Sequence, residues 1–343
     1  MRPGGLGDTP AMQAIFAVTV PFFALVLLGW VAARSHVLPE SAIPGLNAYV
    51  LFFALPCLLF RFGASLPPGR LANPTLIGIY LAAALIVIAV TVRVTLRRAG
   101  SSDGVDLRDA AFGALVAAFP NAGFMGVPLL VALLGENAAG PVIGAILVDL
   151  VVTSTLCISL AQAHSQRSGR DEPRSWLPAA LAALRGGLAN PLPWAIGLGA
   201  AFSALNLELI GPIAQIVRML GDSATPVALF TIGTVLWRAG QHAHTRTPVG
   251  QYLPVALIKL LLHPALVFGI GSAARALGAP VTPFGLMVLT LTAALPSASN
   301  VSVLAERYGA DNGRVARIIM ASTILAFATF SVGAWLFGAG ASP

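Results

Sequence analysis

Ten predominantly apolar stretches follow one another along this chain of 343 residues. A helix of about 20 apolar residues crosses the hydrocarbon core of a bilayer, so each stretch is a candidate membrane span. Charged residues make up 10% of the chain, whereas a soluble domain is roughly 25% charged, which excludes a soluble enzyme. We expect an all-α membrane protein with ten transmembrane helices, near residues 12–33, 44–63, 75–96, 110–134, 140–161, 189–207, 209–237, 249–275, 283–307 and 315–338.

The net charge of +7 is concentrated in alternate loops. All basic residues except Lys259 are arginines, and short cytoplasmic loops carry the excess of Lys and Arg. With the N-terminus outside, most arginines fall in cytoplasmic connections. We therefore expect a multi-pass protein of the cytoplasmic (inner) membrane with both termini outside, surrounded by lipid and not binding nucleic acid. These cytoplasmic arginines are Arg34, Arg93, Arg97, Arg98, Arg108, Arg167, Arg170, Arg174, Arg185, Arg238, Arg246, Arg307, Arg314 and Arg317.

The expected helices form two sets of five. We expect an extracytoplasmic N-terminus at 1–11, a first five-helix repeat at 12–161, a cytoplasmic linker at 162–188, a second repeat at 189–338 and an extracytoplasmic C-terminus at 339–343. Because five is an odd number, the second set enters the membrane from the opposite side. The two sets would therefore be inverted relative to each other.

Two sequence matches support a repeat. The pattern AxPxxLF occurs at 54–60 and again 170 residues later at 224–230. Prolines that interrupt the fourth and ninth expected helices, Pro120 and Pro296, are 176 residues apart. Both spacings are close to half the chain and relate corresponding helices. The sequence thus predicts an inverted repeat, a plan common among secondary transporters.

Those two helices contain residues that open a helix in mid-membrane. Residues 119–128 read FPNAGFMGVP and residues 295–300 read LPSASN. Proline removes a backbone donor and glycine lets the chain leave helical geometry. Half-helix N-termini that meet at one depth would form an anion site; the alternative is a pair of harmless kinks. The candidate substrate-binding residues are Pro120, Asn121, Gly123, Gly126, Pro296, Ser297, Ser299 and Asn300.

Ionisable residues within the expected fifth and eighth membrane helices are the strongest candidates for a coupling role. Asp149 is central in the fifth helix, and Lys259 in the eighth is followed one turn later by His263. Charged groups are costly in a membrane and are therefore functional candidates. Our hypothesis is that Asp149 and Lys259 face each other and couple a proton to transport. The alternatives are a static salt bridge and, for His263, a satisfied interior histidine.

Other charged residues give weaker signals. Arg218 and Asp222 are four residues apart in the seventh expected helix, which favours a local ion pair. Attraction of an anionic substrate by Arg218 is the alternative. Glu306 and Arg307 end the ninth helix and are expected to be a solvated terminus.

No pattern indicates covalent catalysis, a cofactor or a metal centre. Cys57 and Cys157 lie in apolar stretches and form no CxxC pair, so neither a disulfide framework nor a zinc site is expected. His242 and His244 could bind a metal weakly, but a solvated loop is the favoured interpretation. The chain also lacks a P-loop, GxSxG and HExxH.

Several segments spread over nearly the whole chain form a fairly specific combination: PNAGFMGVPLL at 120–130, NPLPWAIGLGAAF at 190–202, TPVALFTIG at 225–233, IKLLLHPAL at 258–266, LPSASNVSVLAERYGAD at 295–311 and the pair Ser322-Thr323. Together they resemble the auxin efflux carrier family, which includes bacterial transporters and the plant PIN-formed carriers. The resemblance implies two inverted five-helix repeats whose broken fourth and ninth helices cross at the substrate site. It also implies a scaffold of helices 1, 2, 6 and 7 and a mobile transport unit of helices 3–5 and 8–10.

Family members move organic anions, including indole-3-acetate in plants and dicarboxylates such as malonate or malate in bacteria. We therefore expect a secondary transporter for a small organic anion that works by an elevator-type alternating-access mechanism. Proton coupling or potential-driven export is favoured over Na⁺ coupling, because carboxylate ligands are sparse. An ion channel or membrane receptor with a pore or pocket lined by the broken helices is the alternative. The resemblance also makes a homodimer through helices 2 and 7 plausible.

Overall fold

The computed structural model describes residues 9–67, 69, 73–98, 105–165, 181, 185, 189–241 and 247–339. Every regular element in these ranges is a helix, and the one β-bridge, between Pro120 and Ser297, stands alone. Most of the expected linker and of the two expected terminal segments lies outside the described residues, as do His242 and His244.

Seven helical segments are long and apolar enough to cross a membrane. On several of them, large apolar side chains such as Leu27, Met219 and Ile324 are more than half exposed, which suits a surface that faces lipid. The chain is therefore a multi-pass membrane protein. The seven segments are α1 (Thr9–Arg34), α2–η2–α3 (Ile43–Tyr49, Val50–Ala54, Leu55–Ser65), α5 (Pro74–Arg98), α8–η5–α9 (Ala139–Val148, Asp149–Thr153, Ser154–Ser165), α12 (Gly211–Gln241), α13–η6–α14 (Val249–Leu257, Ile258–Leu262, His263–Ala276) and α17 (Asn312–Leu336).

The remaining expected spans are short or interrupted. Helix α11 (Pro191–Ala204) has 14 residues and begins with the Asn190 side chain accepting a hydrogen bond from a first-turn N–H, a standard N-cap. The fourth expected span is divided into α6 (Leu107–Ala118), η3 (Ala122–Gly126) and α7 (Val127–Leu134). The ninth is divided into α15 (Pro283–Ala293) and α16 (Val301–Arg307). In the described ranges the structure thus contains seven long spans where the sequence predicts ten.

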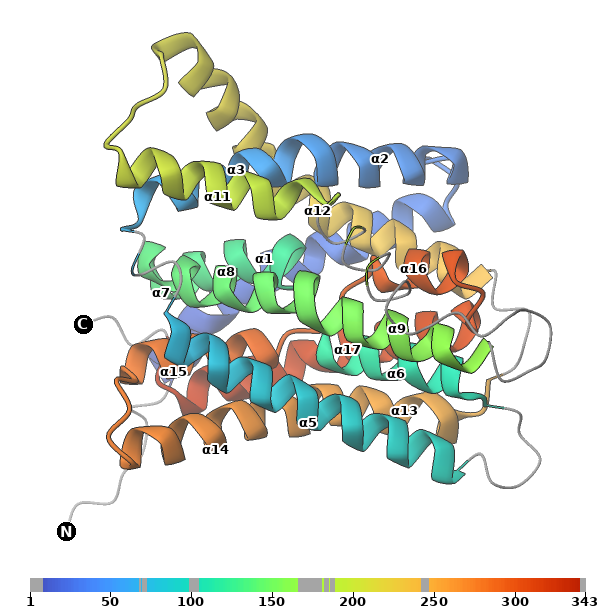
Figure 1. The fold of residues 1–343 in the computed structure, drawn as a ribbon. Coiled ribbons are helices and arrows are strands. Elements are labelled where there is room, and N and C mark those ends of the chain that lie inside the picture. Colours follow the sequence, from blue (N-terminus) through green and yellow to red (C-terminus); the bar gives the residue numbers. More distant parts are fainter. Residues whose placement is uncertain are drawn as a thin grey trace.

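The helices form two packed groups. In the first, α1 packs along α12, and α3 packs along both α11 and α12; α3 and α11 lie side by side at the top of Figure 1. In the second, α5 packs on α6, α8 and α14, while α17 packs on α13 and α15 packs on α14. Helices α1 and α12 also touch α17, so the groups meet along an extended contact.

Glycines bring the helices of the first group unusually close together. A Cβ atom on Gly29 of α1 would overlap a backbone carbonyl of α12, and a Cβ on Gly233 of α12 would overlap a carbonyl of α1. The contact between α3 and α11 is built in the same way, from Gly63 and Gly199. Small residues at helix contacts allow this backbone approach in membrane proteins. Both crossings therefore depend on glycine.

One buried arginine ties together the second group. The sequence predicts Arg314 in a cytoplasmic loop, but the structure places it inside α17, where it is 2% exposed. Its guanidinium donates to the carbonyl of Gln251 on α13 at 3.1 Å and to that of Asp109 on α6 at 2.9 Å. It also donates to the hydroxyl of Thr95 on α5 at 3.3 Å. A planar fork with several donors can join three helices in this way.

Candidate functional site

The two broken helices cross, and their unwound segments are hydrogen-bonded to each other. The Asn121 N–H donates to the Pro296 carbonyl at 2.8 Å, and the Ala298 N–H donates to the Phe119 carbonyl at 3.0 Å. The pair of bonds forms the isolated antiparallel bridge between Pro120 and Ser297. Both bonds are made by the residues that flank Pro120 and Ser297, so the N–H that Pro120 lacks is not needed for the bridge. The breaks at Pro120 and Pro296 thus lie at one place.

In the first unwound segment, the chain returns to helical geometry immediately after Asn121. The Asn121 carbonyl accepts from the N–H groups of Met125 and Gly126, both at 3.0 Å, which closes a wide π-type turn. A Cβ on Gly126 would lie 2.6 Å from a methyl carbon of Leu295. Gly123 has no atom within 4 Å of the corresponding position. Gly126 therefore permits the close approach of the two segments, whereas Gly123 leaves space open.

A serine from a third helix supports the second segment. The hydroxyl of Ser322 on α17 accepts from the Ser297 N–H at 3.1 Å and donates to the Ile319 carbonyl at 2.9 Å. The Ser299 carbonyl accepts from the Ser302 hydroxyl at 3.0 Å and so helps to begin α16. The unwound backbone is thereby partly satisfied by protein, as the membrane interior requires.

Three side-chain atoms at the crossing have no hydrogen-bond partner in the part of the chain that the structure describes. The side-chain oxygens of Asn121, Ser297 and Asn300 are buried and make no hydrogen bond to any described residue. Asn121 is 2% exposed and Ser297 1% exposed. A buried polar group left unpaired costs about 1–3 kcal/mol. These three residues are therefore available to a ligand.

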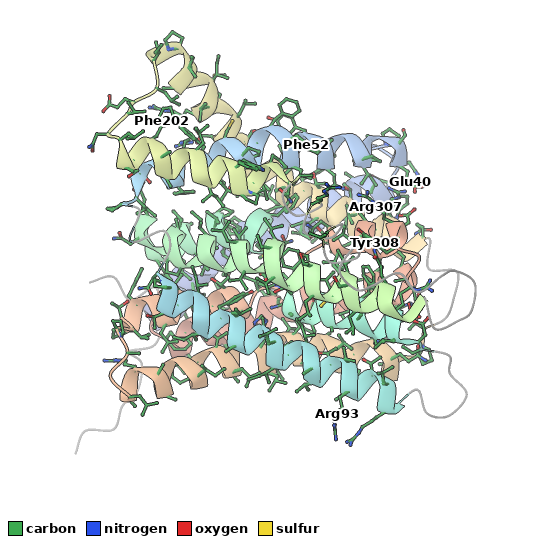
Figure 2. All side chains as sticks on the ribbon, in the orientation of Figure 1. Glu40, Phe52, Arg93, Phe202, Arg307 and Tyr308 are labelled. Carbon is green, nitrogen blue, oxygen red and sulfur yellow. The ribbon has the colours of Figure 1, made fainter. Side chains whose placement is uncertain are left out.

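Two cavities meet at this place. The smaller, of about 30 Å³, is lined by Asn121, Gly123 and Asn300 among others. The larger, of about 480 Å³, extends from the crossing between α2 and α16 toward Arg307 and Tyr308, which Figure 2 labels. The residues that line both cavities are Leu51, Phe119, Phe124, Leu150 and Asn300.

Comparison with known proteins places this architecture in a family. A family model described as "Membrane transport protein" matches residues 14–334. The chain belongs to that family. The match covers both broken helices and both helix groups, so the crossing described above is part of a membrane transport protein.

Individual relatives of this membrane transport protein align over most of their length. The chain is 28% identical over 334 residues to a "Putative malonate transporter" of Rhizobium meliloti (strain 1021), covering 97% of this chain and 98% of the relative. It is 22% identical over 335 residues to "Auxin efflux carrier component 8" of Arabidopsis thaliana, covering 86% and 89%. It is 23% identical over 311 residues to "Uncharacterized transporter YfdV" of Escherichia coli (strain K12), covering 90% and 92%. All three relatives are named as transporters or carriers.

The transporter also contains a buried polar cluster beside the crossing. One carboxylate oxygen of Asp149 accepts from the Tyr80 hydroxyl at 2.8 Å and the other from the Thr153 hydroxyl at 3.1 Å. The Lys259 ammonium donates to the Ala293 carbonyl at 2.6 Å and lies 3.5 Å from Nδ1 of His263. Asp149, Tyr80, Lys259 and His263 are each 0% exposed.

The cluster differs from the pairing that we hypothesised. No ion pair joins Asp149 to Lys259 among the described residues, because other groups occupy both side chains. The ring of Tyr80, whose hydroxyl binds Asp149, and the ring of His263, next to Lys259, have centroids 5.4 Å apart, and Nε2 of His263 has no partner in the described part of the chain. Ala293 is the last residue of α15, so Lys259 places a positive charge at the negative end of that helix.

The expected local pair between Arg218 and Asp222 is wrong. Asp222 instead accepts from Arg61 of α3 at 2.6 Å. Arg218 is exposed and lines a separate cavity with Arg61 and Glu208. None of these residues lines the cavities at the crossing. Arg218 is thus not brought together with the other candidate site residues.

Sequence reasoning did not assign roles to Ser322, Tyr80 and Arg307. Ser322 and Tyr80 are polar groups in otherwise apolar stretches, which was an available signal. Arg307, expected to be a solvated helix end, is exposed but lines the larger cavity. It has that position because α16, which packs on α17 and α6, lines the same cavity as residues of α2.

Proposed function

We propose that this protein is a secondary transporter that binds a small organic anion at the crossing of the two broken helices. The observation that carries the proposal is the set of three unpaired oxygens, on Asn121, Ser297 and Asn300, that lie where the two segments meet. An asparagine amide can also turn its NH₂ group toward a ligand. The binding residues would be Pro120, Asn121, Gly123, Gly126, Pro296, Ser297, Ser299 and Asn300.

The anion would be a monocarboxylate, a dicarboxylate or an auxin-like molecule. The start of η3 supports an anion, because the first turn of a helix carries partial positive charge; the Ala122 N–H itself donates to the Pro120 carbonyl at 2.7 Å. The names of two relatives, which mention malonate and auxin, are consistent with a carboxylate. The site contains no charged side chain among its described lining residues, so recognition would rely on amides, hydroxyls and backbone.

We further propose that the chain forms ten spans arranged as two inverted repeats, 12–161 and 189–338. The count follows when each broken pair is taken as one span and α11 as another. The glycines of the two close crossings support the repeat: Gly29 and Gly199 are 170 residues apart, and so are Gly63 and Gly233. The AxPxxLF pattern has the same spacing. Corresponding helices would thus use corresponding glycines.

Transport would proceed by an elevator-type movement of one helix group against the other. The group of α1, α2–α3, α11 and α12 would be the scaffold, held rigid by its glycine crossings. The other group would be the transport unit, which carries the crossing and is tied together by Arg314. With both termini outside the cytoplasmic membrane, the larger cavity would open to the cytoplasm. Lipid would surround the bundle.

Coupling would involve the buried polar cluster. Asp149, Lys259 and His263 lie within the proposed transport unit, and Lys259 contacts the end of α15 just before the break. A change in the protonation of Asp149 would alter its hydrogen bonds with Tyr80 and Thr153. The resulting structural change would be transmitted to the crossing. Proton coupling is our proposal in preference to Na⁺, and the chain would use no ATP, cofactor or resident metal.

Association through helices 2 and 7 is also proposed. The supporting feature is on α12, where the apolar residues Ile213, Ile216 and Met219 are about half exposed or more. They recur at helical spacing on the extracytoplasmic half of α12 as we orient it. A second copy or lipid would cover them.

The experiment is a thermal-shift screen of purified protein against carboxylates, from acetate and malonate to indole-3-acetate, followed by counterflow in proteoliposomes. We expect stabilisation by at least one carboxylate that is lost in Asn121→Ala and Asn300→Ala. Stabilisation that survives both changes would place the ligand elsewhere. Saturable counterflow identifies a transporter, whereas non-saturating flux without counterflow would indicate the ion channel alternative.

A further inference from the structure

The two cavities at the crossing differ in size and in chemistry. The smaller, at about 30 Å³, has room for only one or two water-sized groups. It holds the polar side chains of Asn121 and Asn300. A carboxylate group fits there, but the body of an organic anion does not. The body must extend into the cavity of about 480 Å³.

Apart from Asn300, the residues that the larger cavity shares with the smaller one at the crossing are apolar. Phe119, Phe124, Leu51 and Leu150 line both cavities, and Val303 of α16 lies on the way outward. A second carboxylate placed against these side chains would be desolvated without a partner. Transfer of an unpaired charge into apolar surroundings is far more costly than transfer of a neutral group.

The charged lining residues lie at the far end of the same cavity. Arg307 is seven residues beyond Asn300 along α16, which at about 1.5 Å per residue places their Cα atoms about 10 Å apart. Arg238 also lines this end, but its charge is offset by Glu40 at 3.1 Å. Arg307 makes no hydrogen bond or ion pair within the described ranges, and Glu306 is its charged neighbour on the cavity wall.

We propose that the cavity selects anions by the distance between their charged groups. The inference rests on the proposed function, with one carboxylate at Asn121 and Asn300. A monocarboxylate with an apolar body fills the cavity, whereas malonate or succinate places its second charge on the apolar wall. A longer α,ω-dicarboxylate reaches Arg307. An extended chain gains roughly 1.2 Å per bond, so sebacate has the required length.

The experiment measures binding of acetate, butyrate, hexanoate, malonate, succinate and sebacate to the full-length protein in nanodiscs by calorimetry. We expect affinity to rise from acetate to hexanoate, succinate to bind about tenfold or more weakly than butyrate, and sebacate to bind about tenfold or more tightly than succinate. The variant Arg307→Gln should lower the affinity for sebacate by about tenfold and change the affinity for hexanoate less than twofold. The variant Glu306→Gln should raise the affinity for sebacate.

Arg93→Gln is the matched control, because Arg93 is exposed on α5 and far from Arg307 in Figure 2. It should leave all six affinities unchanged. Malonate or succinate binding as tightly as butyrate, or sebacate binding that is insensitive to Arg307→Gln, would overturn the length selection while the proposed function stands. Absence of binding by every carboxylate, including those of the thermal-shift screen, would overturn both.

Discussion

Ser322 offers a sharp test of how the crossing is held together. Its hydroxyl is the acceptor for the Ser297 N–H in the unwound segment, and the side chain is 0% exposed. Ser322→Ala removes the acceptor and leaves that N–H buried and unpaired, at a cost of about 1–3 kcal/mol. The small gain in helix propensity from alanine, about 0.5 kcal/mol, offsets part of the loss.

The neighbouring residue provides the control. Thr323 is 5% exposed and its hydroxyl only donates back to the Ile319 carbonyl of its own helix at 2.8 Å. Thr323→Ala therefore leaves no N–H unpaired, and we expect it to cost well under about 1 kcal/mol. In a chain of this size, Ser322→Ala should lower Tm by roughly 1–4 °C more than Thr323→Ala does.

The assay is thermal unfolding of both variants in the same detergent, with and without a stabilising carboxylate. Because the orphaned N–H loosens the segment that carries Ser297, Ser322→Ala should also raise the Kd of that carboxylate. Equal Tm values for the two variants would refute the reasoning, since the hydrogen bond across to α17 would then contribute nothing measurable.

Three further predictions concern other parts of the molecule. Asp149→Asn should abolish the pH dependence of labelled-substrate uptake, because the carboxylate that would change protonation is gone; an unchanged pH profile with full activity would exclude the coupling role. Gly233→Ala should destabilise the protein by several kcal/mol or prevent folding, because its Cβ would overlap a carbonyl of α1, whereas Gly197→Ala, which meets no atom within 4 Å, should be tolerated in the same Tm measurement. Arg314→Gln should lower the stability by about 3 kcal/mol or more by breaking bonds to three helices, and a Tm within 1 °C of the parent would contradict that assignment.

The helix breaks could be predicted from the sequence, and their pairing could not. Proline and glycine act locally, so Pro120 and Pro296 mark the interruptions without any knowledge of the fold. Which backbone groups then bond to each other depends on the packing of residues about 175 positions apart. The support from Ser322 depends on the same packing. The unpaired side chains of Asn121 and Asn300 follow from that geometry.

Charged residues show where local spacing misleads. Arg218 and Asp222 satisfy the helical spacing for an ion pair, yet Arg61 from another helix binds Asp222 at 2.6 Å. The side chains of that pair are exposed, at 40% for Arg61 and 63% for Asp222. Exposed ion pairs contribute little to stability. Arg314 was assigned to a loop because the expected apolar span begins at residue 315, but α17 begins at Asn312 and three acceptors on other helices satisfy the guanidinium. For both Asp222 and Arg314, the partners come from segments that are distant in the sequence, so local spacing does not predict them.

The hydrogen bonds between the unwound segments limit how the molecule can move. Two of these bonds join the first half of the chain to the second at the centre of the bundle. The Asn121 N–H donates to the Pro296 carbonyl, and the Ala298 N–H donates to the Phe119 carbonyl. A motion that rocked one half against the other would have to break both bonds where no bulk water replaces them. Motion between groups that each contain helices from both halves leaves them intact. The ligand site would then travel as one piece and would not be assembled and taken apart in each cycle.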